Sequence, residues 1–334
     1  MNGSVLQVTD LRVEIASRRG VVHAVDGVSL EVPAGQAVGV VGESGSGKSM
    51  TLRAILGVLP PEAKITAGQV LLDGQDLAHL SNTQLNRVRG PKIAMIFQEP
   101  MSALNPVMRV GAQIAEGPQV HLGMNRAKAG ERALELMRRV GIPDPERRYR
   151  AYPHEFSGGM RQRVMIAIAL SCEPSVVLCD EPTTALDVTI QDQILRLLTR
   201  LCRESGTSLV FVTHDLPVVA QVCDQLAVMY AGQIVERGPV KDVLTRPSHP
   251  YTLGLVRSAP DVDHVRSSLL AIPGSPPSLI NPPAGCRFHP RCSFAELDCR
   301  TTMPPLRPIS AERATACLHY ERCLEALDTQ GADR

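Results

Sequence analysis

The chain has 334 residues, 44% of them hydrophobic, which is enough for one large domain with a sizeable core and a smaller second domain. Its 35 basic and 34 acidic side chains leave a formal net charge of +1, so it lacks the strong positive field of a nucleic-acid binder. No apolar run approaches the roughly 18 residues that cross a bilayer, and the first residues do not resemble a secretory signal. We therefore expect a cytosolic protein that reaches a membrane only through partners.

Apolar and alternating segments predict the elements in chain order. Strands are predicted at 6–16, 25–32, 37–41, 70–72, 93–97, 176–179, 208–213, 226–230 and 233–238. Helices are predicted at 50–58, 110–140, 164–170, 190–204 and 216–222. Because strands and helices alternate, the expected core is an α/β fold with a mostly parallel sheet flanked by helices.

Residues 42–49 read Gly-Glu-Ser-Gly-Ser-Gly-Lys-Ser and match the phosphate-loop pattern G-x-x-x-x-G-K-[ST] between a predicted strand and a predicted helix. Glycines let backbone N–H groups turn inward around phosphate oxygens, and the helix presents its positive end to the anion. Lys48 would reach the β- and γ-phosphates, and Ser49 would ligate Mg²⁺. The candidate nucleotide-binding residues are Gly42, Ser44, Gly45, Ser46, Gly47, Lys48, Ser49 and Met50. The alternative is a glycine-rich turn without a ligand, which the complete motif and its flanks disfavour.

Two acids follow the apolar strand predicted at 176–179. At a strand tip, Asp180 can hold Mg²⁺ through water, and Glu181 can act as a general base toward an attacking water. Upstream, Ser157-Gly158-Gly159 leads into a predicted helix, which makes a second helix start suited to an anion. Taken alone, Asp180 and Glu181 would be interpreted as two solvated acids at a strand end, and Ser157-Gly158-Gly159 as an ordinary loop. The complete phosphate loop upstream favours roles for both segments in binding and hydrolysing a nucleotide.

The order of these motifs resembles the ATP-binding subunit of an ABC transporter over residues from about 5 to 245. The motifs that carry the resemblance are Gly42–Ser49, Gln98, Ser157-Gly158-Gly159, Asp180-Glu181, Ala185-Leu186-Asp187 and His214. The resemblance implies a P-loop NTPase: a RecA-like core, an ABC helical subdomain at about 100–165 and an antiparallel β subdomain. It also implies a head-to-tail dimer that sandwiches ATP.

On this resemblance the catalytic residues are Glu181, His214 and Gln98. Gln98 would sense the γ-phosphate and join Ser49 and Asp180 around Mg²⁺, while His214 would contact the γ-phosphate. Ser157, Gly158 and Gly159 would serve the partner's nucleotide, and Asp187 would lie at the dimer seam. An aromatic residue that stacks on adenine is expected upstream of the phosphate loop, where only His23 is available; we favour a surface histidine there.

A narrower resemblance is to the ATPases of bacterial dipeptide and oligopeptide importers. It is carried by residues 98–106, 152–163, 248–252, 273–277 and 286–292. It implies a subunit that hydrolyses ATP to power peptide import from the cytoplasmic face of the plasma membrane, as a peripheral protein. The implied partners are a second ATPase subunit, distinct in a heterodimer or identical in a homodimer, two transmembrane permeases and, through them, an extracytoplasmic peptide-binding protein.

The alternatives are the ATPase of a nickel or other small-solute importer, which commonly lacks so long a cysteine-bearing tail, and an ABC-type DNA-repair ATPase. The near-zero charge and the lack of a long coiled coil disfavour DNA repair, and we expect no nucleic-acid partner. A regulator that does not hydrolyse ATP is disfavoured by the presence of Glu181 and His214.

Composition changes near Arg246, which predicts an ATP-binding domain at 1–245 and a small proline- and cysteine-rich C-terminal domain at 246–334 without a long amphipathic segment. Five of the nine cysteines lie in this tail. The spacing Cys286-x5-Cys292-x6-Cys299-x17-Cys317 lacks the C-x2-C pairs of zinc knuckles, and four thiolates can hold an iron–sulfur cube. The importer resemblance suggests a [4Fe–4S] cluster on these four residues, with Zn²⁺ as second choice and unligated thiols as third. His289, His319 and Cys323 are left outside the ligand set.

Overall fold

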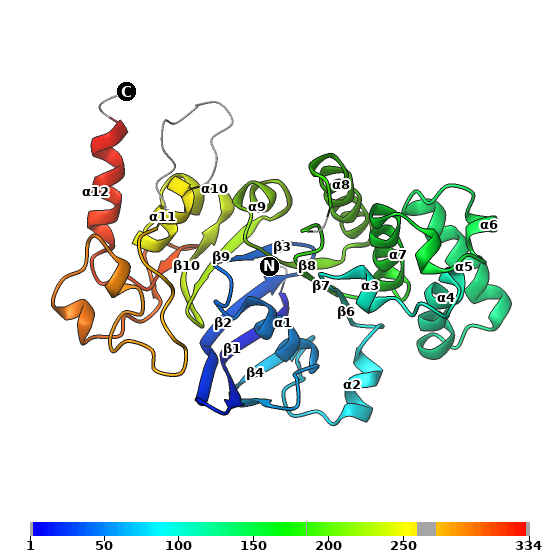
Figure 1. Ribbon diagram of the computed structural model, residues 1–334, viewed down its shortest axis with the longest axis horizontal. Coiled ribbons are helices and arrows are strands. Elements are labelled where there is room, and N and C mark those ends of the chain that lie inside the picture. The colour runs from blue at the N-terminus through cyan, green and yellow to red at the C-terminus, as the bar shows by residue number, and fades with distance from the viewer. Residues whose placement is uncertain (1–2, 185, 259–271, 332–334) are drawn as a thin grey trace.

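Two β-sheets organise the molecule, a computed structural model that describes residues 3–184, 186–258 and 272–331 (Figure 1). Among these residues the larger sheet has eight strands in the order β11-β12-β10-β9-β3-β8-β7-β6. Its parallel strands are β3 (Ala37–Val41), β6 (Ile93–Ile96), β7 (Val176–Asp180), β8 (Ser208–Thr213) and β9 (Gln225–Tyr230). Every residue of β3, β7 and β8 is buried, as the apolar runs predicted for a sheet covered on both faces. β10 (Gln233–Pro239) pairs antiparallel with β9.

The smaller sheet is antiparallel, as the family resemblance implied, in the order β2-β1-β4-β5. Its strands are β1 (Ser4–Ser17), β2 (Gly20–Pro33), β4 (Ala63–Leu72) and β5 (Gln75–Asp76). Alternating residues of β1 and β2 enter one core with residues of α1 (Lys48–Leu56), the helix that follows the phosphate loop. The small sheet therefore packs against the helix that begins at the phosphate loop.

A group of helices at the right of Figure 1 occupies the position expected of the helical subdomain. It contains α3 (Pro100–Ala103), α4 (Val110–His121), α5 (Arg126–Arg139), α6 (Pro145–Arg148) and α7 (Gly158–Leu170). The helical pattern predicted at 110–140 is confirmed but is divided between α4 and α5. The Asn125 side chain accepts a hydrogen bond from the backbone N–H of Lys128 at 3.0 Å, so it caps a new helix and divides the segment in two.

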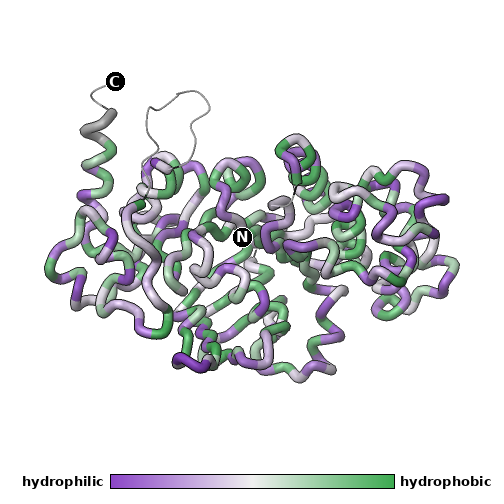
Figure 2. The backbone as a smooth tube through the Cα atoms, viewed as in Figure 1, coloured by the Kyte–Doolittle hydropathy of each residue, from purple (hydrophilic) through white to green (hydrophobic). Residues whose placement is uncertain are grey.

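Three other helices of the ATP-binding region connect its strands: α2 (Asn82–Val88), α8 (Val188–Ser205) and α9 (Leu216–Val222). The helix α10 (Val240–Thr245) follows β10 and leads to the tail. Each turn of α8 contains both hydrophobic and hydrophilic residues (Figure 2), and its apolar residues such as Leu198 and Leu201 form the buried face of an amphipathic helix. We did not predict α2, although Ser81 and Gln84 form a capping box at its start.

The tail packs against the ATP-binding region and joins its large sheet. It contains α11 (Pro250–Ser258), the strands β11 (Arg307–Pro308) and β12 (Ala314–Thr315), and α12 (Tyr320–Gly331). β12 pairs with β10, and β11 pairs with β12. We did not predict α12, a helix of 12 residues near the end of the tail. The domain boundary at 245 stays a prediction. Among the described residues, no helix has the length and hydropathy needed to cross a bilayer.

Candidate functional site

The phosphate loop lies between the buried strand β3 and the start of α1. The ammonium group of Lys48 donates hydrogen bonds to the backbone oxygens of Gly42 at 2.8 Å and Glu43 at 3.0 Å. Burial lowers the pKa of Lys48, and the nearby carboxylates, with Glu181 foremost, oppose this shift. The loop thus curls around a buried positive charge, the arrangement needed to hold phosphate oxygens.

Two glycines of the loop are required by close packing. Gly47 has φ of 105°, and a Cβ atom there would lie 2.3 Å from the backbone oxygen of Ala24. A Cβ atom on Gly42 would lie 2.1 Å from the backbone oxygen of Met229. The loop is therefore confined between β2 and β9, and larger residues at these two positions would displace its backbone.

Ser49 and Asp180 meet beside the loop. The Ser49 hydroxyl donates a hydrogen bond to Oδ1 of Asp180 at 2.7 Å, and Asp180 is 4% exposed at the end of β7. Burial raises the pKa of Asp180, while the hydrogen bond from Ser49 lowers it. Magnesium prefers such oxygen ligands, so this pair fits a Mg²⁺ site.

Glu181 lies at the centre of a polar group formed by the carboxyl ends of neighbouring strands. Its carboxylate contacts Nδ1 of His214 at 3.2 Å and accepts a hydrogen bond from Nε2 of Gln98 at 3.4 Å. It also accepts a hydrogen bond from the hydroxyl of Thr184 at 3.0 Å, a contact that sequence reasoning missed. Because β6, β7 and β8 are adjacent and parallel, these side chains converge at one edge of the sheet. They surround a carboxylate that can orient and deprotonate water.

The Ser157-Gly158-Gly159 segment begins α7 on the molecular surface. The Ser157 side chain caps the helix by accepting a hydrogen bond from the backbone N–H of Met160 at 3.4 Å. The glycines pack against the start of α8 and the loop before it: a Cβ atom on Gly159 would lie 2.8 Å from the Ile190 side chain, and one on Gly158 would lie 3.5 Å from that of Leu186. Figure 1 shows α7 among the helices at the right of the molecule and α1 near its centre. The role of this segment at a partner's nucleotide stays a prediction.

Asp187 is exposed at the end of the loop before α8. It lies three residues before Ile190 in the sequence, the residue against which Gly159 packs. Ala185 of the same motif lies outside the described residues. His23 lies on β2 with Nδ1 3.5 Å from a carboxylate oxygen of Glu14, and it lines a surface cavity with Arg12 and Arg287. The histidine is thus part of a charged surface, and its contact with adenine stays the less favoured prediction.

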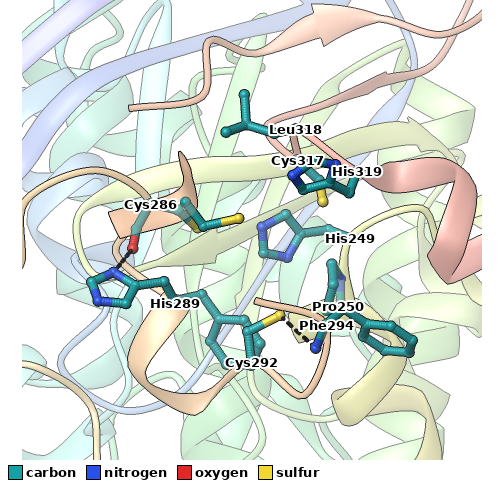
Figure 3. Close-up of a pocket in the computed structure, with 11 residues that line it drawn as sticks. His249, Pro250, Cys286, His289, Cys292, Phe294, Cys317, Leu318 and His319 are labelled. Carbon is teal, nitrogen blue, oxygen red and sulfur yellow. Dashed lines mark hydrogen bonds between the residues drawn. The ribbon is translucent and has the colours of Figure 1, made fainter. Parts of the chain in front are cut away.

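The four cysteines predicted as ligands line one cavity in the tail, together with His249, Phe288 and Phe294 (Figure 3). Burial raises the pKa of Cys292 to about 11 and that of Cys317 to about 12, and the neighbouring thiols push in the same direction. The backbone N–H of Phe294 donates a hydrogen bond to Sγ of Cys292 at 3.4 Å. The four cysteines thus share one cavity, and an N–H group is directed at the sulfur of Cys292; that they hold a metal or cluster stays a prediction.

Two residues near this cavity bear on the ligand set. His319 places Nε2 2.9 Å from Oδ1 of Asp298, and these two residues and Cys299 have ligand atoms within 4.8 Å of one another. Cys323 lies elsewhere: it is fully buried on α12, and its thiol donates to the backbone oxygen of Pro247 at 3.4 Å. His319 is thus a second candidate ligand, whereas Cys323 has a packing role.

Family models match two parts of the chain. A model described as "ABC transporter" matches residues 25–184. A second model, described as "Oligopeptide/dipeptide transporter, C-terminal region", matches residues 235–299. The first match spans the phosphate loop, the Ser-Gly-Gly segment and the two acids, and the second begins in β10 and includes three of the tail cysteines.

Curated relatives extend over nearly the whole chain. A probable peptide ABC transporter ATP-binding protein of Sinorhizobium fredii is 52% identical over 314 residues, covering 93% of this chain and 94% of the relative. The oligopeptide transport ATP-binding protein OppD of Salmonella typhimurium is 47% identical over 312 residues, covering 93% of this chain and 92% of OppD. A solved dimeric structure of the ATP-binding cassette MJ0796, bound to ADP and Pi, has a TM-score of 0.61 at 29% identity and covers 70% of this chain and 98% of that one.

Proposed function

Because this chain belongs to the family of peptide ABC transporter ATP-binding proteins, we propose that it hydrolyses ATP to drive the import of dipeptides or oligopeptides. The observation that carries the proposal is the arrangement at one sheet edge. The buried Lys48 and the Ser49–Asp180 pair lie beside Glu181, and Glu181 is held by Gln98 and His214.

Each residue has a role in phosphoryl transfer. Lys48 and the loop N–H groups offset negative charge on the β- and γ-phosphates. Ser49, Asp180 and Gln98 would hold Mg²⁺, which when bound neutralises the charge that develops on the phosphate oxygens. Glu181 orients the attacking water and accepts its proton, while His214 contacts the γ-phosphate. The remaining loop residues Gly42, Ser44, Gly45, Ser46, Gly47 and Met50 shape the cradle.

The complete site needs a second ATPase subunit. Ser157, Gly158 and Gly159 lie at the start of α7, and Figure 1 shows α7 at the right of the molecule and α1 near its centre. We therefore place the segment over the nucleotide of a partner, with Asp187 at the seam. The similar cassette MJ0796 is dimeric with ADP and Pi, which supports this arrangement. We favour a distinct partner subunit over a second copy of this chain. The pair would bind two permeases at the cytoplasmic face of the plasma membrane, and an extracytoplasmic peptide-binding protein would act through them.

In the tail we propose a [4Fe–4S] cluster ligated by Cys286, Cys292, Cys299 and Cys317, as a structural or sensing group. The common cavity and the N–H group directed at Cys292 support it. The alternative is Zn²⁺, for which His319 could replace one thiolate. The match of the tail to a peptide-transporter C-terminal model favours peptides over nickel or another small solute, and it likewise disfavours DNA repair.

The experiment that tests the catalytic assignment replaces Glu181 by Gln, which keeps hydrogen bonding but removes the base. We expect the Glu181→Gln variant to lose ATP turnover by on the order of 10²-fold or more while ATP affinity is retained. Turnover would be measured on the complex with its permeases, and affinity with a fluorescent ATP analogue. Glu204→Gln, an exposed change on α8, is the matched control. Steady-state turnover at the unmodified rate in Glu181→Gln would remove Glu181 as the base.

A further inference from the structure

The segment between Cys286 and Cys292 contains two buried arginines that the proposed mechanism does not use. Arg287 is 5% exposed and Arg291 is 9% exposed. Arg287 pairs with Asp26 of β2, and Arg291 pairs with Glu43 of the phosphate loop. A segment of the cysteine-bearing tail thus reaches the ATP-binding region with two buried cations, one of them at the nucleotide site.

The contact between Arg291 and Glu43 is bidentate. Nη1 of Arg291 donates to one carboxylate oxygen at 2.7 Å, and Nη2 donates to the other at 3.0 Å. The guanidinium is fixed from its other side by a hydrogen bond from Nε to the backbone oxygen of Pro273 at 2.8 Å. Its carbon lies 5.8 Å from the centre of the Tyr230 ring, in cation–π contact. Such a fork fits a carboxylate in one orientation only.

Glu43 is itself part of the phosphate cradle. Its backbone oxygen accepts one of the two hydrogen bonds that hold the Lys48 ammonium group. Its backbone N–H donates to the hydroxyl of Tyr251, on α11, at 2.8 Å. The residue is therefore held through its side chain by Arg291 and through its backbone by Tyr251, and both of these contacts come from residues beyond 245.

We propose that Arg291 is a positioning residue for the phosphate loop: by holding Glu43 it fixes the backbone that binds Lys48 and neutralises the acid in the phosphate cradle. The inference rests on the proposed ATP site. It extends that proposal, because residues of the cysteine-bearing tail would then hold part of the phosphate loop in place. Arg291 does not touch the reacting atoms; it acts through Glu43.

The charges predict the direction of the effect. Glu43 carries a negative charge next to the place where a triphosphate would bind, and its side chain is 25% exposed. Without Arg291 this charge would repel the phosphates of ATP, and the Glu43 side chain would no longer hold the loop backbone that binds Lys48. Removing the charge of Glu43 in the same chain should therefore recover part of the lost affinity. General loosening of the tail predicts no such recovery.

The test compares the ATP affinity of purified variants, measured with a fluorescent ATP analogue, with their thermal unfolding midpoints. We expect Arg291→Ala to weaken ATP binding by about tenfold, the order expected when a charge near a bound anion loses its counter-ion. The double variant Glu43→Gln/Arg291→Ala should recover most of this loss. Arg291→Lys should fall between Arg291→Ala and the unmodified chain, since it keeps the charge without the fork.

Arg313→Ala is the matched control, because Arg313 is a tail arginine whose side-chain hydrogen bonds go to Glu236 and to the backbone oxygen of Arg246 and not to the phosphate loop. It should lower the unfolding midpoint while ATP affinity stays within about twofold, since no charge near the anion changes. Unchanged affinity in Arg291→Ala, or an equal loss in Arg313→Ala, would overturn the inference. If the unmodified chain failed to bind ATP, the proposed function would fail instead. If Arg291→Ala did not fold, the ATP affinities of Arg291→Lys and of Glu43→Gln/Arg291→Lys would be compared instead. Recovery of affinity in the double variant would support the inference, and no recovery would contradict it.

Discussion

Glu236 is a fully buried carboxylate, and among the described residues its side chain is hydrogen-bonded by Ser248, His249 and Arg313, all in the tail. It accepts hydrogen bonds from the backbone N–H and the hydroxyl of Ser248, at 2.8 and 2.7 Å, and from the backbone N–H of His249 at 2.9 Å. Arg313 donates to it at 3.1 Å. A buried charge persists only where such partners replace water, so this residue joins β10 to the start of the tail.

At this scale we predict that Glu236→Ala lowers the free energy of unfolding by about 3 kcal/mol, because it leaves Arg313 and two backbone donors without their acceptor. Urea unfolding followed by circular dichroism would measure the loss. Asp192→Asn, which alters an exposed pair with Arg196 on α8, should leave stability unchanged within error. Equal stability of Glu236→Ala and the unmodified chain would show that the buried network contributes nothing net.

The short residue patterns around the site were readable from the sequence because each depends on local chemistry. The phosphate loop needs glycines at Gly42 and Gly47, and the packing of both positions shows why. Thr184, Tyr251 and Arg291 gave no comparable signal. Their contacts with Glu181 and Glu43 depend on how distant segments pack, and nothing in their local sequence specifies the partner.

Among the elements, strands were predicted more securely than helices. Buried parallel strands such as β7 and β8 are short apolar runs, which few other structures explain. The division between α4 and α5 was missed because the hydrophobic pattern continues across it, while the cap at Asn125 decides where the second helix starts. The helix α12 was missed because it follows a proline-rich segment that suggested irregular structure throughout.

For the cysteine-bearing tail, we predict that the purified protein contains an iron–sulfur cluster. Protein purified without oxygen should absorb near about 400 nm and contain about four irons per chain, as expected for a thiolate-bound cube. Cys292→Ser should remove both signals, because Cys292 lines the cavity and receives the N–H of Phe294. Cys323→Ser should keep them, because Cys323 contacts Pro247 instead. Stoichiometric zinc without visible absorption would replace the cluster by the Zn²⁺ alternative.

On the scale of the whole molecule, the placement of α7 and α1 in different parts of the fold predicts a shared site (Figure 1). ATP should drive the Glu181→Gln variant into a dimer, either alone or with its partner ATPase subunit. Adding Ser157→Arg should abolish the dimer while each chain still binds ATP, because Ser157 is exposed at the start of α7 and not part of the phosphate loop.

Size-exclusion chromatography with light scattering would detect the dimer, and the bound nucleotide would be counted in each peak. Glu131→Arg, an exposed charge change on α5 of the same subdomain, should leave the dimer intact. Loss of ATP binding by the monomeric Ser157→Arg chain would instead place that segment in the chain's own site.

The sequence by itself determined the residues of the phosphate loop and the positions of the buried strands along the chain, because a phosphate cradle and a buried strand each require particular residues over a short stretch. Only the tertiary structure decided which residues support that chemistry. The tail's strands extend the large sheet, and Arg291 pairs with Glu43, 248 positions away in the sequence. A buried ion pair forms wherever folding brings two charges together out of water, and no local pattern of residues encodes that meeting.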